Sequence, residues 1–155
     1  MGTNYYAIRR LPRSIKGKIC ELLENDSYDD AKLLFDSNYE KIHIGKQSCG
    51  WKFLFNYNNF NYYDLNKKSI DNFLRNENII FCDEYKDIVN IDEFWKMVES
   101  NQDKLDNRTY YQNSENLPFI LMAENVPYEL KDKYNVECYE FYSDGLRFNS
   151  STEFS

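Results

Sequence analysis

The sequence predicts an α+β fold: a compact single domain over residues 1–155, with a mostly antiparallel sheet and helices packed on one face of it. Three observations predict this class. Alternating side chains on both sides of a polar loop are typical of a β-hairpin, several other stretches carry apolar residues at helical spacing, and no repeat or linker divides the chain. Because the chain holds 11 Phe and 14 Tyr, we expect a core built largely from aromatic rings.

The first part of the chain is expected to form one strand and two helices. Thr3 to Arg10 is rich in aromatic and β-branched residues, which predicts a strand. From Ser14, apolar side chains fall at helical spacing until the break at Asn25 to Ser27. Ser27 followed by Asp30 resembles a capping box and predicts the start of the second helix. The apolar positions of the two helices are Ile15, Ile19, Leu22, Leu23, Ala31, Leu34 and Phe35.

An antiparallel hairpin is predicted from Ile42 to Tyr57. Tyr39 to Ile44 and Trp51 to Tyr57 each alternate between two sets of side chains, as residues on the two faces of a sheet do. Gly45 to Gly50 lies between these stretches. We therefore expect Gly45 to Gly50 to form the connection of the hairpin.

The rest of the chain predicts two more helices and further strands. Leu65 to Arg75 has a helical apolar face, and residues 77–89 are typical of two short strands around a polar turn. Asn90, with Glu93 three residues later, is expected to cap a helix, and a last hairpin turns on 143–145. Residues 101–116 are predicted to form a polar loop, and 117–123 either a buried strand or a short helix.

The charge distribution favours a small anionic ligand over duplex nucleic acid. The net charge is −7, whereas a duplex binder needs a field of Lys and Arg. Residues 1–20 nevertheless carry five basic side chains and no acidic one, and residues 41–52 carry three lysines and no acid. We expect a locally basic region on an acidic protein, although the charges could equally be spread over solvated surfaces.

The cysteines and the hydropathy pattern predict a reduced, cytoplasmic protein. The four cysteines lie far apart without a Cys-x-x-Cys pair, and we expect all of them to be unpaired. No apolar run approaches the ~20 residues needed to cross a membrane, and the first residues lack a signal peptide's apolar segment. We therefore expect no membrane partner.

The loop at 45–50 has the components of an anion-binding cradle. Its glycines allow backbone N–H groups to converge, Lys46 supplies a positive charge and Ser48 supplies a hydroxyl donor. It is not a Walker A loop, because that motif opens a helix and a strand is expected here. Glycine, serine and lysine are also ordinary hairpin residues, and the chain's one histidine, His43, could be purely structural.

Four stretches of the chain resemble a family of short tailed-bacteriophage proteins. These are the start MGTNYY, the stretch IHIGKQSCGWKF, an Asp-Glu-Tyr segment at 83–85 followed by a Phe-Trp helix, and the end Glu-Phe-Ser at 153–155. The matches occur in the family's order along the chain. They select Gly2, Thr3, Asn4, Tyr5, Tyr6, His43, Gly45, Lys46, Ser48, Gly50, Trp51, Phe53, Asp83, Glu84, Tyr85, Glu153, Phe154 and Ser155. Since these residues include both ends, we expect both ends to dock near the hairpin.

The sequence departs from the family's pattern at one point that concerns metal binding. Many members carry a Cys-x-x-Cys element before the HIGK loop that resembles a zinc ribbon, whereas this chain has a helical insertion from Leu11 to Asn38 with only Cys20. One histidine and dispersed cysteines do not readily make a tetrahedral zinc site. We therefore expect no metal and no cofactor.

The resemblance implies an accessory phage protein, a class that often acts against host defence. Together with the basic region, the rings and the loop, it predicts sequestration of a small nucleotide-type immune signal, cyclic or NAD-derived, in the cytoplasm of the infected bacterial host. A homo-oligomer is left open. The expected ligand-binding residues are Asn4, Tyr5, Tyr6, Arg9, Lys46, Ser48, Trp51 and Tyr85.

Three other functions remain open from the sequence. The first is a hydrolase or phosphodiesterase that cleaves such a nucleotide, with His43, Glu84 and Glu153 as catalytic residues and Asp83 as a further carboxylate. The second is an acidic inhibitor of a host enzyme, for which the net charge of −7 is the support. The third is a structural role without a ligand.

Overall fold

The computed structural model describes residues 2–48, 51–100 and 140–149. Its strands form one six-stranded sheet in the order β4-β1-β2-β3-β6-β5. All neighbouring strands of this sheet pair antiparallel except β3 and β6, which are parallel. The strands are β1 (Gly2–Arg9), β2 (Lys41–Ser48), β3 (Leu54–Asn56), β4 (Ile79–Asp83), β5 (Glu140–Ser143) and β6 (Leu146–Asn149).

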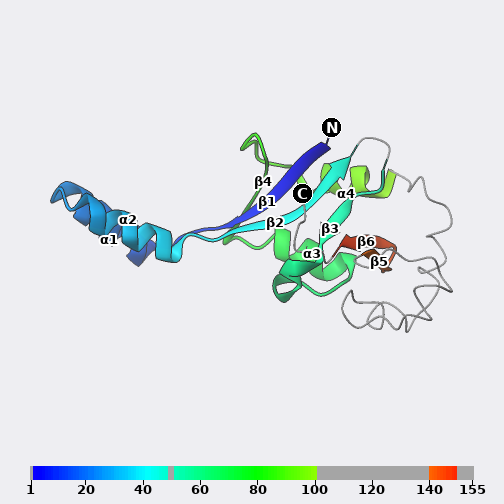
Figure 1. Ribbon diagram of the computed structural model, residues 1–155, viewed down its shortest axis with the longest axis horizontal. Coiled ribbons are helices and arrows are strands. Elements are labelled where there is room, and N and C mark those ends of the chain that lie inside the picture. The colour runs from blue at the N-terminus through cyan, green and yellow to red at the C-terminus, as the bar shows by residue number, and fades with distance from the viewer. Residues whose placement is uncertain (1, 49–50, 101–139, 150–155) are drawn as a thin grey trace.

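Two of the helices cover one face of the sheet, as Figure 1 shows. α3 (Lys67–Leu74) and α4 (Ile91–Ser100) contribute buried side chains to the same apolar cluster as the strands. A 3-10 helix, η1 (Tyr57–Tyr62), follows β3. The α+β class, the mostly antiparallel sheet and the packing of helices on one face are confirmed. Among the described residues, no helix has the length and apolar character that crossing a membrane requires.

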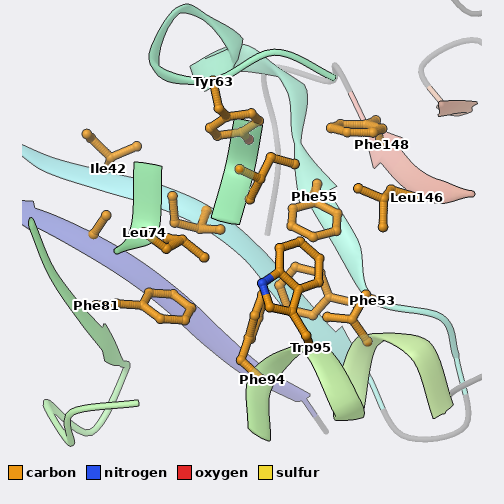
Figure 2. Close-up of a cluster of buried hydrophobic side chains, with 14 of the residues drawn as sticks. Ile42, Phe53, Phe55, Tyr63, Leu74, Phe81, Phe94, Trp95, Leu146 and Phe148 are labelled. Carbon is orange, nitrogen blue, oxygen red and sulfur yellow. The ribbon is translucent and has the colours of Figure 1, made fainter. Parts of the chain in front are cut away.

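Aromatic rings dominate the core between the sheet and these helices (Figure 2). Phe53, Phe55, Phe94 and Phe148 are fully buried, and Trp95 is 5% exposed. The ring of Phe94 contacts Phe53, Phe55 and Phe81 edge-on. Because each buried Phe contributes roughly 1.5–3 kcal/mol, this cluster is the main source of stability in the described part of the chain. The expectation of a ring-rich core is confirmed.

The hairpin is confirmed, but its predicted connection was placed too early. Gly45 pairs with Tyr5 on one side and with Phe55 on the other, and β2 continues to Ser48. Gly45 to Ser48 are therefore strand residues rather than loop residues. A bulge at Ile44, opposite the step from Tyr5 to Tyr6, shifts the alternation by one residue and so disguises the continuing strand.

One of the two predicted helix caps is present. The side chain of Asn90 accepts a hydrogen bond from the N–H of Glu93 at 3.0 Å, as predicted. The predicted capping box at Ser27 was wrong, because Ser27 makes no side-chain cap bond. Its backbone is held instead by a Schellman turn in which Asp26 has a φ of 59° and Ser27 N–H donates to Leu22 O at 2.8 Å.

α1 (Arg13–Glu24) and α2 (Tyr28–Asn38) form an arm that projects beyond the ends of β1 and β2 (Figure 1). We call residues 10–39 the helical arm. The N–H of Arg9 donates to the carbonyl of Glu40 at 3.1 Å, and their side chains form an ion pair at 2.7 Å. The helical arm is therefore an insertion into an otherwise tight β1–β2 hairpin.

The remaining elements agree with the sequence in part. Of the two strands expected in residues 77–89, the first is β4, but the second is reduced to a bridge between Cys82 and Ile88. Asp144 and Gly145 turn the last hairpin with φ of 53° and 73°, as the Asp-Gly pair predicts. Cys20 and Cys82 are free thiols. The predictions for residues 101–123, 49 and 138 lie outside the described residues.

Candidate functional site

The side chains of β1 alternate between the core and the opposite face of the sheet. Tyr5 lies in the core, where its ring is 5.5 Å from that of Phe94 on α4. Because neighbouring strand residues point to opposite faces, Asn4 and Tyr6 lie on the face away from α3 and α4. The N-terminal part of the chain thus docks on the hairpin, as expected, with Gly2 paired to Ser48. Residues 150–155 lie outside the described residues.

His43 is held on this second face by two residues of β1. Its ring stacks on Tyr6 with 4.9 Å between the ring centres, and its Nε2 lies 3.0 Å from Asn4 Oδ1. Burial lowers the pKa of His43 below 6.5, and the nearby charges of Lys46 and Lys41 lower it further, whereas a hydrogen bond to the backbone of Gly45 raises it. The net lowering leaves the imidazole neutral at pH 7.

Three basic side chains lie on the same face of the sheet as His43: Lys41 and Lys46 of β2 and Arg147 of β6. Lys46 is paired with Asn4 in the sheet, and the Nζ of Lys41 lies 4.2 Å from the ring centre of Tyr6. Burial lowers the pKa of Lys46, and the positive charge of Arg147 lowers it further, which places that guanidinium close by. We define the cationic face as Asn4, Tyr6, Lys41, His43, Lys46, Trp51 and Arg147.

Arg147 is the residue of this group that the sequence did not predict. Leu54 is paired with Lys46 on one side and with Arg147 on the other, so the three side chains lie in one row across β2, β3 and β6. The Arg147 guanidinium lies 5.5 Å from the ring centre of Trp51 and donates to the carbonyl of Lys52 at 3.2 Å. The parallel pairing of β3 with β6 brings it there.

The side chain of Gln47 links the end of β2 to Trp51. The Nε2 of Gln47 donates to the carbonyls of Ser48 and Trp51, at 2.9 and 2.6 Å. The N–H of Trp51 also donates to the carbonyl of Ser48, at 3.0 Å. These bonds hold Trp51 beside the end of β2. Gly45 serves packing, since a Cβ there would lie 2.3 Å from the carbonyl oxygen of Leu54.

The carboxylates predicted around residue 84 serve the backbone. Glu84 Oε1 accepts from the N–H of Asn4 at 3.0 Å, and Glu84 N–H donates to the carbonyl of Asn4 at 2.9 Å. Asp83 Oδ1 accepts from the N–H groups of Tyr85 and Asp87. Glu84 is thus linked to His43 through Asn4. The Tyr85 side chain is 70% exposed. Glu153 lies outside the described residues.

Two other predicted ligand-binding residues lie away from the cationic face. Tyr5 is part of the core; its hydroxyl donates to Met97 Sδ at 3.5 Å, and burial raises its pKa. Arg9 is paired with Glu40 at the base of the helical arm. Five residues of strand separate Arg9 from Asn4, a distance of roughly 17 Å. The structure therefore brings together Asn4, Tyr6, His43, Lys46 and Trp51.

A groove of about 830 Å³ between α3 and α4 is the other concave feature with many charges. Two of its four cations are paired within it: Arg75 binds Asp71 and Asp92, and Lys67 binds Glu99. Its floor is closed by Trp95, whose Nε1 donates to Asp71 at 2.8 Å. Since four basic and four acidic side chains line the groove, an anion gains less there than at the cationic face. The lining residues are Lys67, Lys68, Asp71, Arg75, Asp92, Trp95, Lys96, Glu99 and Asp144.

No family model, curated protein or solved structure matches the chain. The resemblance to phage proteins therefore stays a prediction. Among the described residues, no group of three His, Cys, Asp or Glu side chains is placed to hold a metal ion. Within these residues, the chemistry available at the cationic face consists of fixed positive charges, a neutral imidazole and two aromatic rings.

Proposed function

We propose that the cationic face binds a small anionic ligand of nucleotide type. The observation that carries the proposal is the row in which Lys46 and Arg147 flank Leu54, with the ring of Trp51 beside the guanidinium. Lys46, whose pKa burial and then the positive charge of Arg147 lower, gains from an anion that it shares with that arginine. Lys46 offers a point charge and Arg147 a planar fork, the two complementary ways in which proteins hold phosphate.

The aromatic residues of the cationic face suit the nucleobase of such a ligand. Trp51 and Tyr6 lie near opposite ends of the row of cations, and a nucleobase stacks on rings of this kind with roughly 1–3 kcal/mol per base. His43 is neutral and bonded to Asn4, which supports a role in holding the face in shape. These features support sequestration more than cleavage.

The biological setting of this proposal comes from the resemblance to phage proteins. A protein that binds a nucleotide tightly without converting it lowers the free concentration of that nucleotide by mass action. We propose that the ligand is an immune signal of an infected bacterial cell, cyclic or NAD-derived, and that the protein acts in the cytoplasm of that cell. The compact, multiply charged face supports a ligand with more than one phosphate over a single inorganic ion.

Binding is tested with a panel of cyclic dinucleotides, ADP-ribose and NAD, with inorganic phosphate as the comparison, by calorimetry on the full chain. Lys46→Ala and Arg147→Gln should each weaken binding roughly ten- to a hundredfold, because each removes a charge-assisted contact. Lys68→Ala, an exposed lysine of the groove, is the matched control and should bind as the parent does. Unchanged affinity in both site variants would exclude the cationic face as the binding site.

Cleavage is tested separately with His43→Ala. Mass spectrometry of ligand released by heat distinguishes intact from altered nucleotide. If the parent protein returns the ligand intact, sequestration is supported. If it returns cleaved ligand and His43→Ala lowers the rate on the order of a hundredfold while still binding, the hydrolase is the correct function.

A further inference from the structure

The helical arm exposes an unusual share of apolar surface. α1 has no buried residue although Ile15, Ile19 and Leu22 follow one another along one side of it, and Ala31 is the one buried residue of α2. Five of the seven exposed large hydrophobic side chains of the described residues lie in or directly beside these two helices. They are Leu23 at 46%, Tyr28 at 61%, Leu33 at 69%, Phe35 at 39% and Tyr39 at 42% exposure.

Charge is separated along the length of the same arm. Residues 9–18, at the base, contain five basic side chains and no acidic one, whereas residues 19–30, toward the tip, contain five acidic side chains and no basic one. Apart from Arg9, none of the basic residues and none of these acidic residues forms an ion pair with a described residue. The arm thus carries a positive base and a negative tip.

We propose that two copies of the chain associate through their helical arms, packed side by side in opposite directions. The positive base of each arm then lies against the negative tip of the other, so both ends of the interface are complementary. A parallel arrangement would place the two negative tips together, which is repulsive. The antiparallel one has twofold symmetry, the commonest symmetry of protein dimers, and closes after two copies.

The helices have the form that such an association requires. α1 has 12 residues and α2 has 11, so each is about 17 Å long. Two helical hairpins side by side make a four-helix bundle, in which each helix buries an apolar stripe that a single hairpin leaves open to water. Tyr28 and Phe35 lie two turns apart on one side of α2, and their exposed rings are the apolar anchors that the partner would cover. An interface of this modest size suits a dimer that forms at micromolar concentration.

The first test is sedimentation equilibrium of the full chain across the micromolar range. The apparent mass should rise from that of the 18.7 kDa monomer toward twice that value, and added salt should oppose the rise. Tyr28→Asp should shift the dissociation constant upward at least tenfold with little effect on folding, since this side chain is largely exposed in the monomer. A mass that stays at 18.7 kDa at every concentration would overturn the proposal.

Charge reversal tests the direction of packing. The base variant carries Lys16→Glu with Lys18→Glu, and the tip variant carries Glu24→Lys with Asp29→Lys. Each should dimerise roughly tenfold more weakly than the parent, because the charge of residues 9–18 falls from +5 to +1 in the base variant and that of residues 19–30 from −5 to −1 in the tip variant. A mixture of the two variants should associate more strongly than either variant alone, because the unchanged negative tip of the base variant then faces the unchanged positive base of the tip variant.

The control is a third variant, Lys68→Glu with Lys96→Glu, which changes the net charge as much as the base variant but lies on the groove between α3 and α4. It should dimerise like the parent. If the control is weakened as much as the base variant, the effect is one of net charge and the proposal fails. It also fails if the parent dimerises but the two arm variants do not associate when mixed, because the surfaces then meet in another way.

Discussion

Gly45 has no side chain, and this allows β2 to pack closely against β3 and the core. A Cβ at Gly45 would lie 2.3 Å from the carbonyl oxygen of Leu54 and 2.6 Å from the ring of Phe53. Neither neighbour can easily move, since one belongs to the backbone of β3 and the other is fully buried. The glycine that resembled part of a phosphate loop is required for packing.

Gly45→Ala should therefore lower the free energy of unfolding by roughly 1–3 kcal/mol, as overpacking does. Denaturant titration of the full chain measures the change. Gly17→Ala is the matched control: Gly17 lies inside α1 and a Cβ there meets nothing within 4 Å, so the same substitution should leave stability unchanged or raise it by up to about 1 kcal/mol. A neutral Gly45→Ala would show that β2 and β3 are less closely packed than the structure describes.

At His43, the direction of the pKa shift predicts how stability depends on pH. The folded protein holds the pKa of His43 below 6.5, chiefly through burial, so the unfolded chain takes up a proton first as the pH falls. The free energy of unfolding should decrease as the pH falls below about 6.5, and this contribution should be fully present above it.

His43→Gln should make that decrease shallower between about pH 6.5 and 5.5, where His43 is the side chain whose ordinary pKa lies closest. The chain has one histidine, so no other imidazole contributes. Denaturant titrations of both proteins at several pH values give the comparison. A steeper decrease in the variant would mean that the hydrogen bond to Gly45 outweighs burial and that the pKa is raised instead.

At the scale of elements, the sequence predicted most of the described strands and helices because each has its own hydrophobic period. The errors lie where one residue interrupts the hydrophobic period of an element. The bulge at Ile44 is an example, because it made the strand residues Gly45 to Ser48 resemble a loop. The two helix caps show the same limit. Asn90 and Ser27 both precede a helix, but only the side chain of Asn90 reaches a backbone N–H.

Asn90→Ala should therefore lower the free energy of unfolding by about 1 kcal/mol, because α4 loses a cap beside the buried Phe94 and Trp95. Ser27→Ala, the matched variant at the start of α2, should change it by only a few tenths of a kcal/mol. Thermal unfolding followed by circular dichroism is sufficient for the comparison. Equal losses in the two variants would mean that the hydroxyl of Ser27 does cap α2 in solution.

At the scale of the whole molecule, the candidate site was predicted in part, because the resemblance to phage proteins grouped the start of the chain with the stretch around His43. Asn4, Tyr6 and His43 come together because β1 and β2 form a hairpin closed by the arm, and the alternation of both strands was visible. Arg147 was not predicted because parallel strands such as β3 and β6 are not joined by a short turn, so no local sequence pattern indicates that they pair. Tyr5 was expected at the site because it belongs to the MGTNYY stretch, and a matched stretch does not distinguish the side chains that face the core from those that face away.

Replacement of the helical arm by a two-residue Asn-Gly turn between Arg9 and Glu40 should leave the sheet folded. The backbone bond between these two residues already has the geometry of a tight hairpin, and no residue of the arm belongs to the main apolar cluster. Circular dichroism should lose helix signal while the cooperative thermal transition persists. A variant that fails to fold would show that the arm contributes to the stability of the sheet.

The parallel pairing of β3 and β6 also has a consequence for the order in which the protein is made. β6 leaves the ribosome long after β3, and until then the three residues of β3 form an unprotected sheet edge next to the most buried phenylalanines. Unpaired edges of this kind recruit other strands. Chains released before residue 146 should therefore aggregate or be degraded, and they would also lack Arg147 of the cationic face. Synthesis of β6 thus provides both the protection of the β3 edge and the last cation of the proposed binding surface.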